Sequence, residues 1–115
     1  MGQPSTPYIE VTIANGGNLS GMAELHGATI AALILPTIDN AAITFQGSGD
    51  RINFKNVYDD QGNEVSIVAS TGDRAVRAPA VVGSFKYIKV RTGTSGTPVN
   101  QTAARTIGIV LKDAA

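Results

Sequence analysis

The chain has no cysteine and no tryptophan, and it has a single histidine among its 115 residues. Without cysteine it can form neither a disulfide nor a thiolate metal site, and the redox compartment stays undetermined. Charge is also scarce, because Asp, Glu, Lys and Arg make up 16% of the residues, against about a quarter in typical soluble domains. So few reactive side chains suit binding or assembly better than catalysis, and we predict that the protein is not an enzyme.

Basic residues are too few and too evenly balanced to form a nucleic-acid-binding stripe, since nine basic and nine acidic side chains give a net charge of zero. The nearest cluster is Lys86, Lys89 and Arg91. In a strand, Lys86 and Lys89 fall on opposite faces while Lys89 and Arg91 share one, which predicts a solvated sheet face and no nucleic-acid partner. A charge-poor surface lacks the self-repulsion that keeps subunits apart, so we favour a homo-oligomer or assembly subunit over a monomer.

Long hydrophobic runs are missing as well. The longest, Ala28–Pro36, is far too short to cross a bilayer as a helix, so we expect no membrane partner. The polar N-terminus, MGQPSTPY, lacks the charged and apolar regions of a secretory signal, which predicts synthesis in the cytoplasm. Residues 1–7 hold two prolines and predict an extended N-terminal arm, and residues 8–115 have the length of a single domain.

What the sequence does have is a succession of short β-type runs separated by turn residues. Between Tyr8 and Lys112 such runs recur roughly every ten residues, with Gly, Asn, Asp and Pro between them. This pattern predicts an all-β fold, an antiparallel β-sandwich that is jelly-roll-like and has about eight short strands. The alternation predicts these shared inward faces: Ile9, Val11 and Ile13; Leu19, Gly21, Ala23 and Leu25; Ile43 and Phe45; Val65, Ile67 and Ala69; and Ile107, Ile109 and Leu111. In FKYIKVR, Phe85 and Tyr87 fall on one face and Ile88 and Val90 on the other, and the alternation leaves either face open as the buried one.

Three segments have less regular patterns. The run TIAALILP has no polar face, so we predict a strand that is buried on both sides and ends at Pro36, with a helix as the rival interpretation. In INFKNVY, Ile52 and Phe54 fall on one face and Asn53, Lys55 and Val57 on the other; the pattern leaves open which face is buried and allows a bulge. Ser70–Asp73 predicts a turn, and Pro79 predicts an edge strand or an irregular crossing after it.

Asp59 and Asp60 are the only two acidic residues that are adjacent in the sequence. With Asn63 and Glu64 nearby they offer the oxygen ligands that Ca²⁺ prefers, but their spacing is not that of an EF-hand. Aspartate is common in turns, so a hairpin turn with Gly62–Asn63 at its tip is favoured over a metal site. As a glycosidase pair the two aspartates lack an apolar pocket and a partner across a cleft.

His26 lies two residues after Glu24, on the same predicted strand face. A base or a metal ligand would need further partners at a recognisable spacing, so a structural histidine is favoured. Four aromatic residues are candidates for a sugar-binding platform but are more typical of core positions: Phe45, Phe54, Tyr58 and Tyr87. The sequence contains neither a nucleophile elbow nor a P-loop. We therefore predict no catalytic, cofactor-binding or metal-binding residue, and no cofactor.

Residues 42–67 and 85–112, which include the segment TSGTPVNQ, and the LSG at Leu19 carry a family resemblance. They resemble a family of small tailed-bacteriophage proteins that are usually encoded among virion-structure genes and mostly lack an assigned function. The resemblance extends over almost the entire chain and assigns no role to a residue. A weaker likeness, to discoidin-type galactose-binding sandwiches, rests on Phe54 and the YIKVR strand. Without that family's apical aromatic and basic residues, it implies a sandwich but no sugar binding.

The phage resemblance implies a virion protein that is made in the host cytoplasm. Its most direct implication is a capsid decoration (cement) protein, which binds between subunits of the major capsid protein and stabilises the assembled head. A trimer or a dimer would match local capsid symmetry. The N-terminal arm and residues 93–98 would be the segments available to reach neighbouring virion subunits. A tail or head–tail accessory protein and a host-glycan-binding module are the alternatives.

Overall fold

The structure is a computed structural model of the chain, and it describes residues 8–112. The predicted arm, residues 1–7, lies outside the described residues. The described part contains strands, one short 3₁₀ helix and no α-helix, and none of it forms a helix long and apolar enough to span a membrane. The elements are β1 (Tyr8–Ile13), β2 (Ala23–Glu24), β3 (Thr29–Ser48), β4 (Lys55–Asn56), β5 (Ile67–Arg77), η1 (Ala80–Ser84), β6 (Tyr87–Thr92) and β7 (Arg105–Lys112).

The sheet is built around β3, which is 20 residues long. The first half of β3 pairs with β7 on one side and β5 on the other, and its second half pairs with β6 and with β5 and β4. Every one of these pairs is antiparallel, and the order across the sheet is β1-β7-β3-β6-β2, with β4 and β5 added to β3. The predicted antiparallel all-β class is therefore confirmed.

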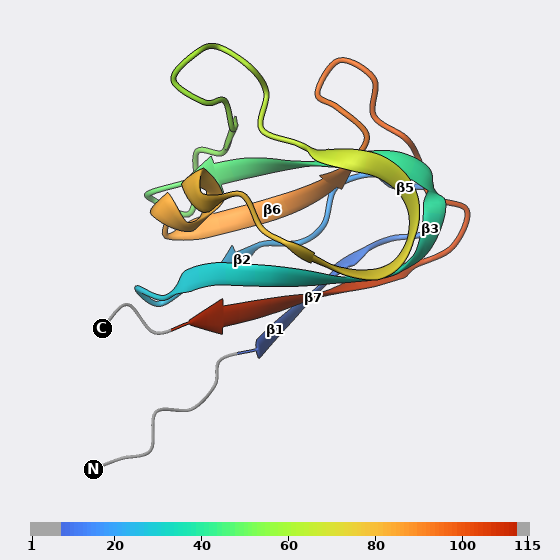
Figure 1. Cartoon of the computed structure of the whole chain (residues 1–115), viewed down its shortest axis with the longest axis horizontal. Helices are drawn as coiled ribbons and strands as arrows, with labels where there is room; N and C mark the ends of the chain where they lie inside the picture. Colours follow the sequence, from blue (N-terminus) through green and yellow to red (C-terminus); the bar gives the residue numbers. More distant parts are fainter. Residues whose placement is uncertain (1–7, 113–115) are drawn as a thin grey trace.

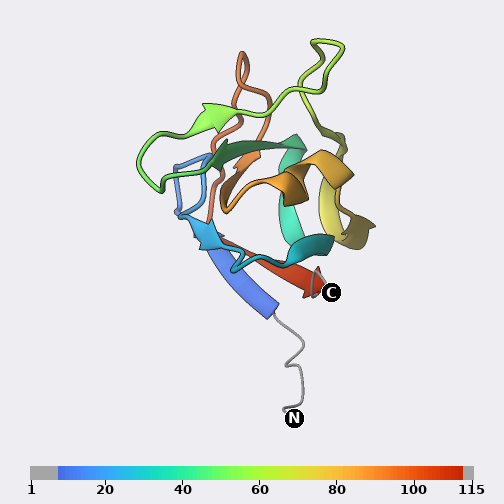
Figure 2. The same ribbon diagram turned by 90° about the vertical axis from the view of Figure 1, so that its left-hand side faces the viewer.

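The sheet bends back on itself and surrounds the core (Figure 1, Figure 2). β1 and β2 are the two ends of the strand order. Just before β2, the Gly21 N–H donates to the carbonyl of Thr12 in β1 at 3.4 Å, so the sheet is nearly closed. The strands form one hydrogen-bonded sheet of seven strands, in which β3 takes the place of two shorter predicted strands. A jelly-roll-like sandwich remains a prediction.

The bend in β3 lies between Thr37 and Ala41, where its pairing with β5 changes register. Pairing between β3 and β7 ends at Ile34, so the ladder does not need an N–H from Pro36. The strand therefore continues through Pro36, and the prediction that it ends there is wrong. The predicted turn at Ser70–Asp73 is wrong as well, because these residues lie within β5, where positive φ angles at Gly72 and Asp73 bend the strand.

The core contains the residues predicted from the alternation of each strand. Ile13, Phe45, Ile88, Ile107 and Ile109 are all fully buried. Most of the other residues predicted to point inward are buried in the same cluster or pack against it, as Ile9 and Ile67 do. The prediction is wrong at Gly21 and Ala69, which are exposed. In β6 the buried face is the one that carries Ile88 and Val90.

The run TIAALILP is buried on one face, whereas the sequence predicted burial on both. Ile30, Leu33 and Leu35 are buried, but Ile34 is 40% exposed. A bulge in the pairing with β7, between Ile30 and Ala32, shifts the phase by one residue and explains the spacing of the buried residues.

In INFKNVY, where the sequence left the phase open, the buried face is the one that carries Val57. Ile52 is 81% exposed, and Val57 is the buried residue of this segment. The Asp50 carboxylate accepts hydrogen bonds from the backbone N–H groups of Ile52 and Asn53, at 2.9 and 2.8 Å, which holds these residues in a turn. Only the two residues of β4 pair with β3 here. The predicted irregular crossing at Pro79 is confirmed, because it leads into η1, where Val82 is buried.

Candidate docking surface

Two loops project side by side from one end of the sheet (Figure 1). The first is the hairpin at residues 57–65, in which Tyr58 pairs with Glu64. The Asp59 carboxylate accepts hydrogen bonds from the backbone N–H groups of Gln61 and Asn63, each at 2.9 Å. These donors stabilise the charged form and lower the pKa of Asp59. The predicted hairpin turn is confirmed, and the carboxylate of Asp59 is used inside it.

The second loop, residues 93–98, is closed by hydrogen bonds. Gly93 pairs with Pro98, and the Gly93 N–H donates to the Ala42 carbonyl at 2.7 Å. Thr94 and Thr97 exchange backbone hydrogen bonds, each of 3.2 Å. Gly93 has a φ of 95°, and a Cβ there would lie 2.6 Å from the Thr97 carbonyl oxygen, so only glycine fits. The loop is thus a closed turn held by its own backbone hydrogen bonds.

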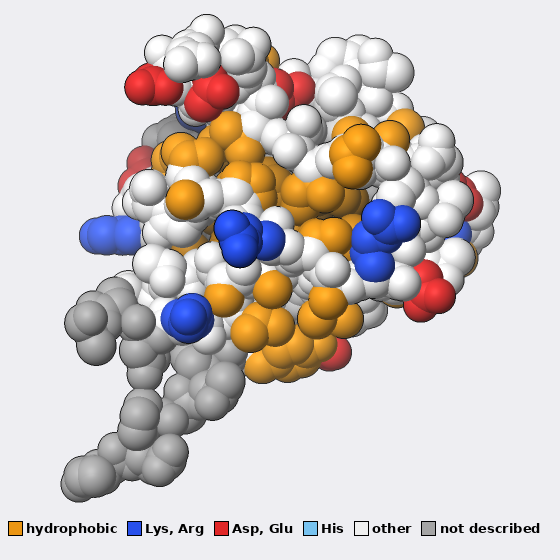
Figure 3. All heavy atoms as spheres, in the orientation of Figure 1, with side chains coloured by type: hydrophobic (Ala, Val, Ile, Leu, Met, Phe, Trp, Pro, Cys, Tyr) orange, Lys and Arg blue, Asp and Glu red, His pale blue; other side chains and the backbone are white. Residues whose placement is uncertain are grey.

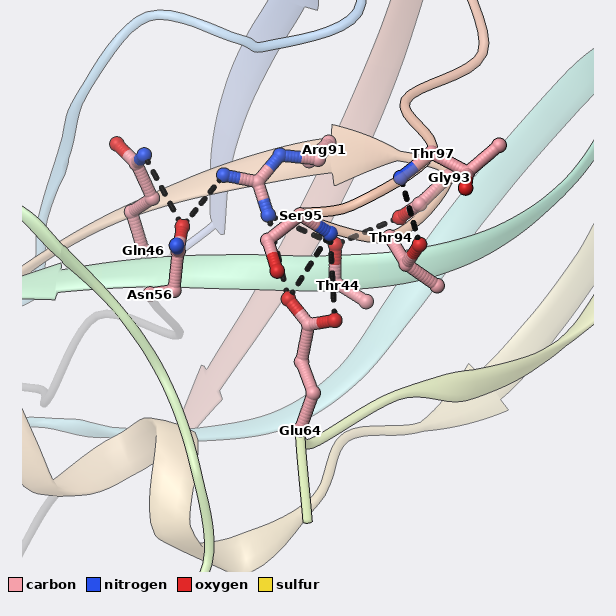
Figure 4. Close-up of polar contacts among 9 residues, drawn as sticks. All are labelled: Thr44, Gln46, Asn56, Glu64, Arg91, Gly93, Thr94, Ser95 and Thr97. Carbon is pink, nitrogen blue, oxygen red and sulfur yellow. Dashed lines mark hydrogen bonds and ion pairs between the residues drawn. The ribbon is translucent and has the colours of Figure 1, made fainter. Parts of the chain in front are cut away.

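A buried arginine joins the two loops to the sheet (Figure 4). Arg91, on β6, is 6% exposed. Its guanidinium lies 3.4 Å from the Glu64 carboxylate and donates to the Asn56 side-chain oxygen at 2.6 Å and to the Thr44 hydroxyl at 3.3 Å. The Glu64 carboxylate in turn accepts from the Ser95 N–H at 3.1 Å. Glu64 on the hairpin therefore holds both Arg91 and the second loop.

This network has a direct structural consequence. Removing two charges from water is costly, and the pair is stable here because Asn56 and Thr44 accept further hydrogen bonds from Arg91 and the Ser95 N–H donates to Glu64. Thr44 completes the network, since its hydroxyl donates to the Gly93 carbonyl at 2.6 Å. The two loops are thus held in a fixed relation to each other and to β3 and β6.

The solvated basic face predicted for β6 is therefore wrong at Arg91. Lys89 does share a strand face with Arg91, as predicted, but its ammonium lies 4.4 Å from the centre of the Phe54 ring. Sequence reasoning missed the Arg91 network because its partners Glu64, Asn56 and Thr44 lie 27, 35 and 47 positions away along the chain. No local spacing can show such a contact.

A shallow depression of about 320 Å³ surrounds His26. It is lined by Glu24, His26, Gly27, Lys86 and Tyr87. The predicted neighbours do meet, since His26 Nδ1 lies 3.5 Å from the Glu24 carboxylate. The same carboxylate forms an ion pair of 3.1 Å with Arg51, so its charge already has a partner. His26 occupies an exposed turn and has a positive φ of 53°, and within residues 8–112 no three acidic or histidine side chains gather into a possible metal site.

The aromatic residues do not form a common platform. Phe45 is fully buried in the core, whereas Tyr58 is exposed on the hairpin. Arg51 lies over the Tyr87 ring, 5.5 Å from its centre, much as Lys89 lies over Phe54. These cations occupy the ring faces on which a sugar would have to stack.

An exposed apolar surface that strand pairing assembles lies on the outside of β1, β7, β3 and β5. We call it the outer apolar face, and it consists of Tyr8, Ala32, Ile34, Ala75, Gly108 and Val110. Strand pairing aligns Gly108, Ile34 and Ala75 in one row and Tyr8, Val110 and Ala32 in the next.

Tyr8 is 53% exposed, and its ring lies over Gly108, where a Cβ would collide with it. In Figure 3 hydrophobic side chains gather in the lower part of the molecule, over β1, β3 and β7. Charged residues surround this region: Glu10, Asp73, Arg77 and Lys112 are all exposed. A contiguous apolar patch with a charged rim is typical of a protein–protein interface.

Comparison with known proteins adds no relative: no family model, no curated protein and no solved structure matches the chain.

Proposed function

We propose that the protein is a structural subunit of a bacteriophage particle, and that it acts as a capsid decoration (cement) protein. In this role it binds between subunits of the major capsid protein as a homo-oligomer, a dimer or a trimer. We take a jelly-roll-like sandwich as the working description of its bent sheet. The observation that carries the proposal is the outer apolar face, together with the family resemblance of the sequence.

The outer apolar face suits docking against protein more than any chemical role. Its residues belong to strands of one continuous sheet, so the surface is rigid before binding. A partner that covers it removes apolar area from water, and little conformational entropy is lost because the sheet is already ordered. A decoration protein that binds only the assembled lattice stabilises the shell by mass action.

The two anchored loops support the same role. Their tips are polar and exposed, with Asp60, Gln61, Gly96 and Thr97 among the exposed residues. The Arg91–Glu64 pair fixes the loops beneath these tips. A pre-organised polar projection can therefore contact a neighbouring subunit at a small entropic cost, in addition to the contact made by the outer apolar face.

The copy number of the protein in purified particles tests this proposal. Quantitative mass spectrometry of mature virions, calibrated against the major capsid protein, should find hundreds of copies per particle. A dozen copies or fewer would replace the decoration role with the tail or head–tail role, because those structures have low copy numbers. Absence of the protein from the particles would refute a virion role altogether.

A further inference from the structure

The strand β5 leaves one of its edges open. It spans 11 residues and, among the described strands, it pairs with β3 alone. In Figure 1 it forms an arc at the side of the molecule. An unpaired edge offers backbone N–H and C=O groups to any other strand that can approach it.

The pairing register identifies the groups that face this edge. The Ala78 N–H donates to the Ala31 carbonyl, which continues the register of β5 with β3. Hydrogen-bonded and non-bonded pairs alternate along an antiparallel ladder. The pairs at Val76 and Arg74 are therefore bonded to β3, and those at Ala75 and Arg77 are not. Pro36, which has no N–H, occupies a non-bonded position in this scheme, as it must.

The backbone groups of Ala75 and Arg77 therefore point toward the open edge, and their side chains share the outer face of the sheet. Asp73 lies two residues before Ala75, at the bend of β5, where its φ is 56°. All three residues are exposed, and the ion pairs among residues 8–112 include neither Asp73 nor Arg77. One acidic and one basic side chain thus flank a small residue at equal spacing.

We propose that this edge pairs with the same edge of a second copy of the chain, antiparallel and about a twofold axis at Ala75. In that register each Asp73 lies opposite Arg77 of the other copy, so the dimer contains two cross-strand ion pairs. At the centre, Ala75 lies opposite Ala75 of the other copy, where its small side chain lets the two strands approach. The contact is isologous, which a twofold axis requires, and it joins the two outer apolar faces through the row that contains Ile34.

The charges in β5 support this occupant over a foreign strand. Edge strands are often protected from pairing by charges of one sign, which repel a second copy. Here the signs alternate so that self-pairing brings opposite charges together. A partner strand of another protein would have to supply the complementary order, whereas a second copy has it already.

This inference rests on the homo-oligomer of the proposed function and makes it a dimer, since an isologous edge contact cannot close a ring of three. Its test uses the purified protein alone. If the purified protein is a monomer, the proposed interface is refuted, while the capsid role is still decided by copy number. If the copy number refutes the capsid role, the dimer is still decided by the purified protein.

The test combines sedimentation equilibrium with complementary charge variants. The Arg77→Asp variant has acidic residues at both positions and the Asp73→Arg variant has basic ones, so like charges meet in each homodimer. We expect each to dimerise at least tenfold more weakly than the native chain, and an equimolar mixture of the two to form a mixed dimer. The matched control is Arg74→Asp, the same charge change at a position bonded to β3, and it should leave the dissociation constant within about threefold.

A cross-linking variant tests the same register directly. The chain has no cysteine, so Ala75→Cys introduces the only thiol. Facing residues in a hydrogen-bonded antiparallel pair have Cα atoms about 5.5 Å apart, within the range of about 4.4 to 6.8 Å that a disulfide spans. Mild oxidation should convert this variant to a covalent dimer, while Val68→Cys, also exposed on β5, should stay largely monomeric.

Circular dichroism melts show whether each variant is folded. If Asp73→Arg does not fold, Asp73→Asn replaces it in the test, because asparagine tolerates the positive φ at this position. Asp73→Asn should weaken the dimer while keeping the fold. A native chain that stays monomeric at millimolar concentration, or a dimer that Arg77→Asp and Arg74→Asp weaken equally, would overturn the proposal. In either case the charges in β5 serve only to guard the edge.

Discussion

Arg91 carries a full positive charge on β6, a strand whose neighbouring residues Val90 and Thr92 are fully buried. Its charge is tolerable there because Glu64, Asn56 and Thr44 accept hydrogen bonds from the two terminal nitrogens of its guanidinium. A buried pair of this kind often adds little net stability over an apolar pair of the same size, but removing one partner leaves the other unpaired. The value of the pair in this molecule lies in the loops that it positions.

The Arg91→Met variant should therefore lose about 3 kcal/mol of unfolding free energy in a urea titration, because the Glu64 carboxylate remains without its cation. The matched control is Lys89→Met, which removes a charge from the same face of β6 and should cost no more than about 1 kcal/mol. Adding Glu64→Leu to Arg91→Met should recover much of the loss. Equal losses of unfolding free energy for Arg91→Met and Lys89→Met would show that the buried pair stabilises the fold no more than the charge of Lys89 does.

Asp59 gives the hairpin a dependence on pH. Backbone N–H groups of Asn63 and Gln61 lower the pKa of its carboxyl below the usual value of 3.8. A lowered folded pKa contributes stability that is present above the unfolded pKa and is lost as the pH falls through the folded one. We expect the hairpin to stay intact from neutral pH down to about pH 4 and to loosen in stronger acid.

Carboxyl carbon shifts followed by NMR during an acid titration measure this directly. The Asp59 midpoint should lie below that of an aspartate in an unstructured peptide of the same sequence. Amide signals of Gln61 and Asn63 should move with the same midpoint, because they donate the bonds that protonation weakens. In the Asp59→Asn variant these amides should no longer titrate in that range, and an Asp59 midpoint at or above the peptide value would refute the assignment.

At the scale of elements, the period of two along the sequence predicted the strands and their inward residues, because a sheet with one buried face imposes that pattern. Ile107, Ile109 and Leu111 in β7 are examples, and all three are buried. The bends were not predictable in the same way. Pro36 and Gly72 normally signal strand ends, yet here they lie close together at a corner where β3 and β5 turn together, with Gly72 opposite Thr37.

The corner leads to a prediction about Gly72. Its φ is 77°, and a Cβ there would collide with the Pro36 carbonyl oxygen. Gly72→Ala should therefore destabilise the protein by more than the roughly 1 to 2 kcal/mol that a left-handed conformation alone costs an alanine. The matched control is Gly16→Ala, because Gly16 has a φ of 85° and open space around it. Thermal melts of the two variants separate the cost of the left-handed conformation from the cost of the collision. Equal decreases in melting temperature would mean that the corner relaxes around the new methyl group.

At the scale of the whole molecule, few charges and no thiol favour docking against protein, and this stays a prediction that composition makes without a structure. Composition says nothing about where such a surface lies. The outer apolar face could not be located, because strand pairing assembles it from Tyr8 at one end of the described chain and Val110 at the other. Ile34 was predicted to be buried with the rest of its run, so its exposure gave no signal in the sequence.

Ile34 lies at the centre of the outer apolar face and so offers the sharpest test of the docking role. Ile34→Lys places a charge in the middle of the surface that a capsid subunit would cover, and desolvating that charge on docking is costly. Cosedimentation with particles that lack the protein should show binding at least tenfold weaker than that of the native chain. The isolated variant should melt within a few degrees of the native chain, because a lysine on an exposed strand face can extend its ammonium into water.

The matched control is Ile52→Lys, the same substitution at a residue that is 81% exposed in the turn before β4 and outside the outer apolar face. It should bind particles as the native chain does. The oligomeric state of both variants is measured alongside, since Ile34 is the direct neighbour of Ala75 in the sheet. If Ile34→Lys folds, dimerises and still decorates particles normally, then the capsid contact lies elsewhere, and the loops anchored by Arg91 become the surface to mutate, because they are the other rigid projection that the fold presents.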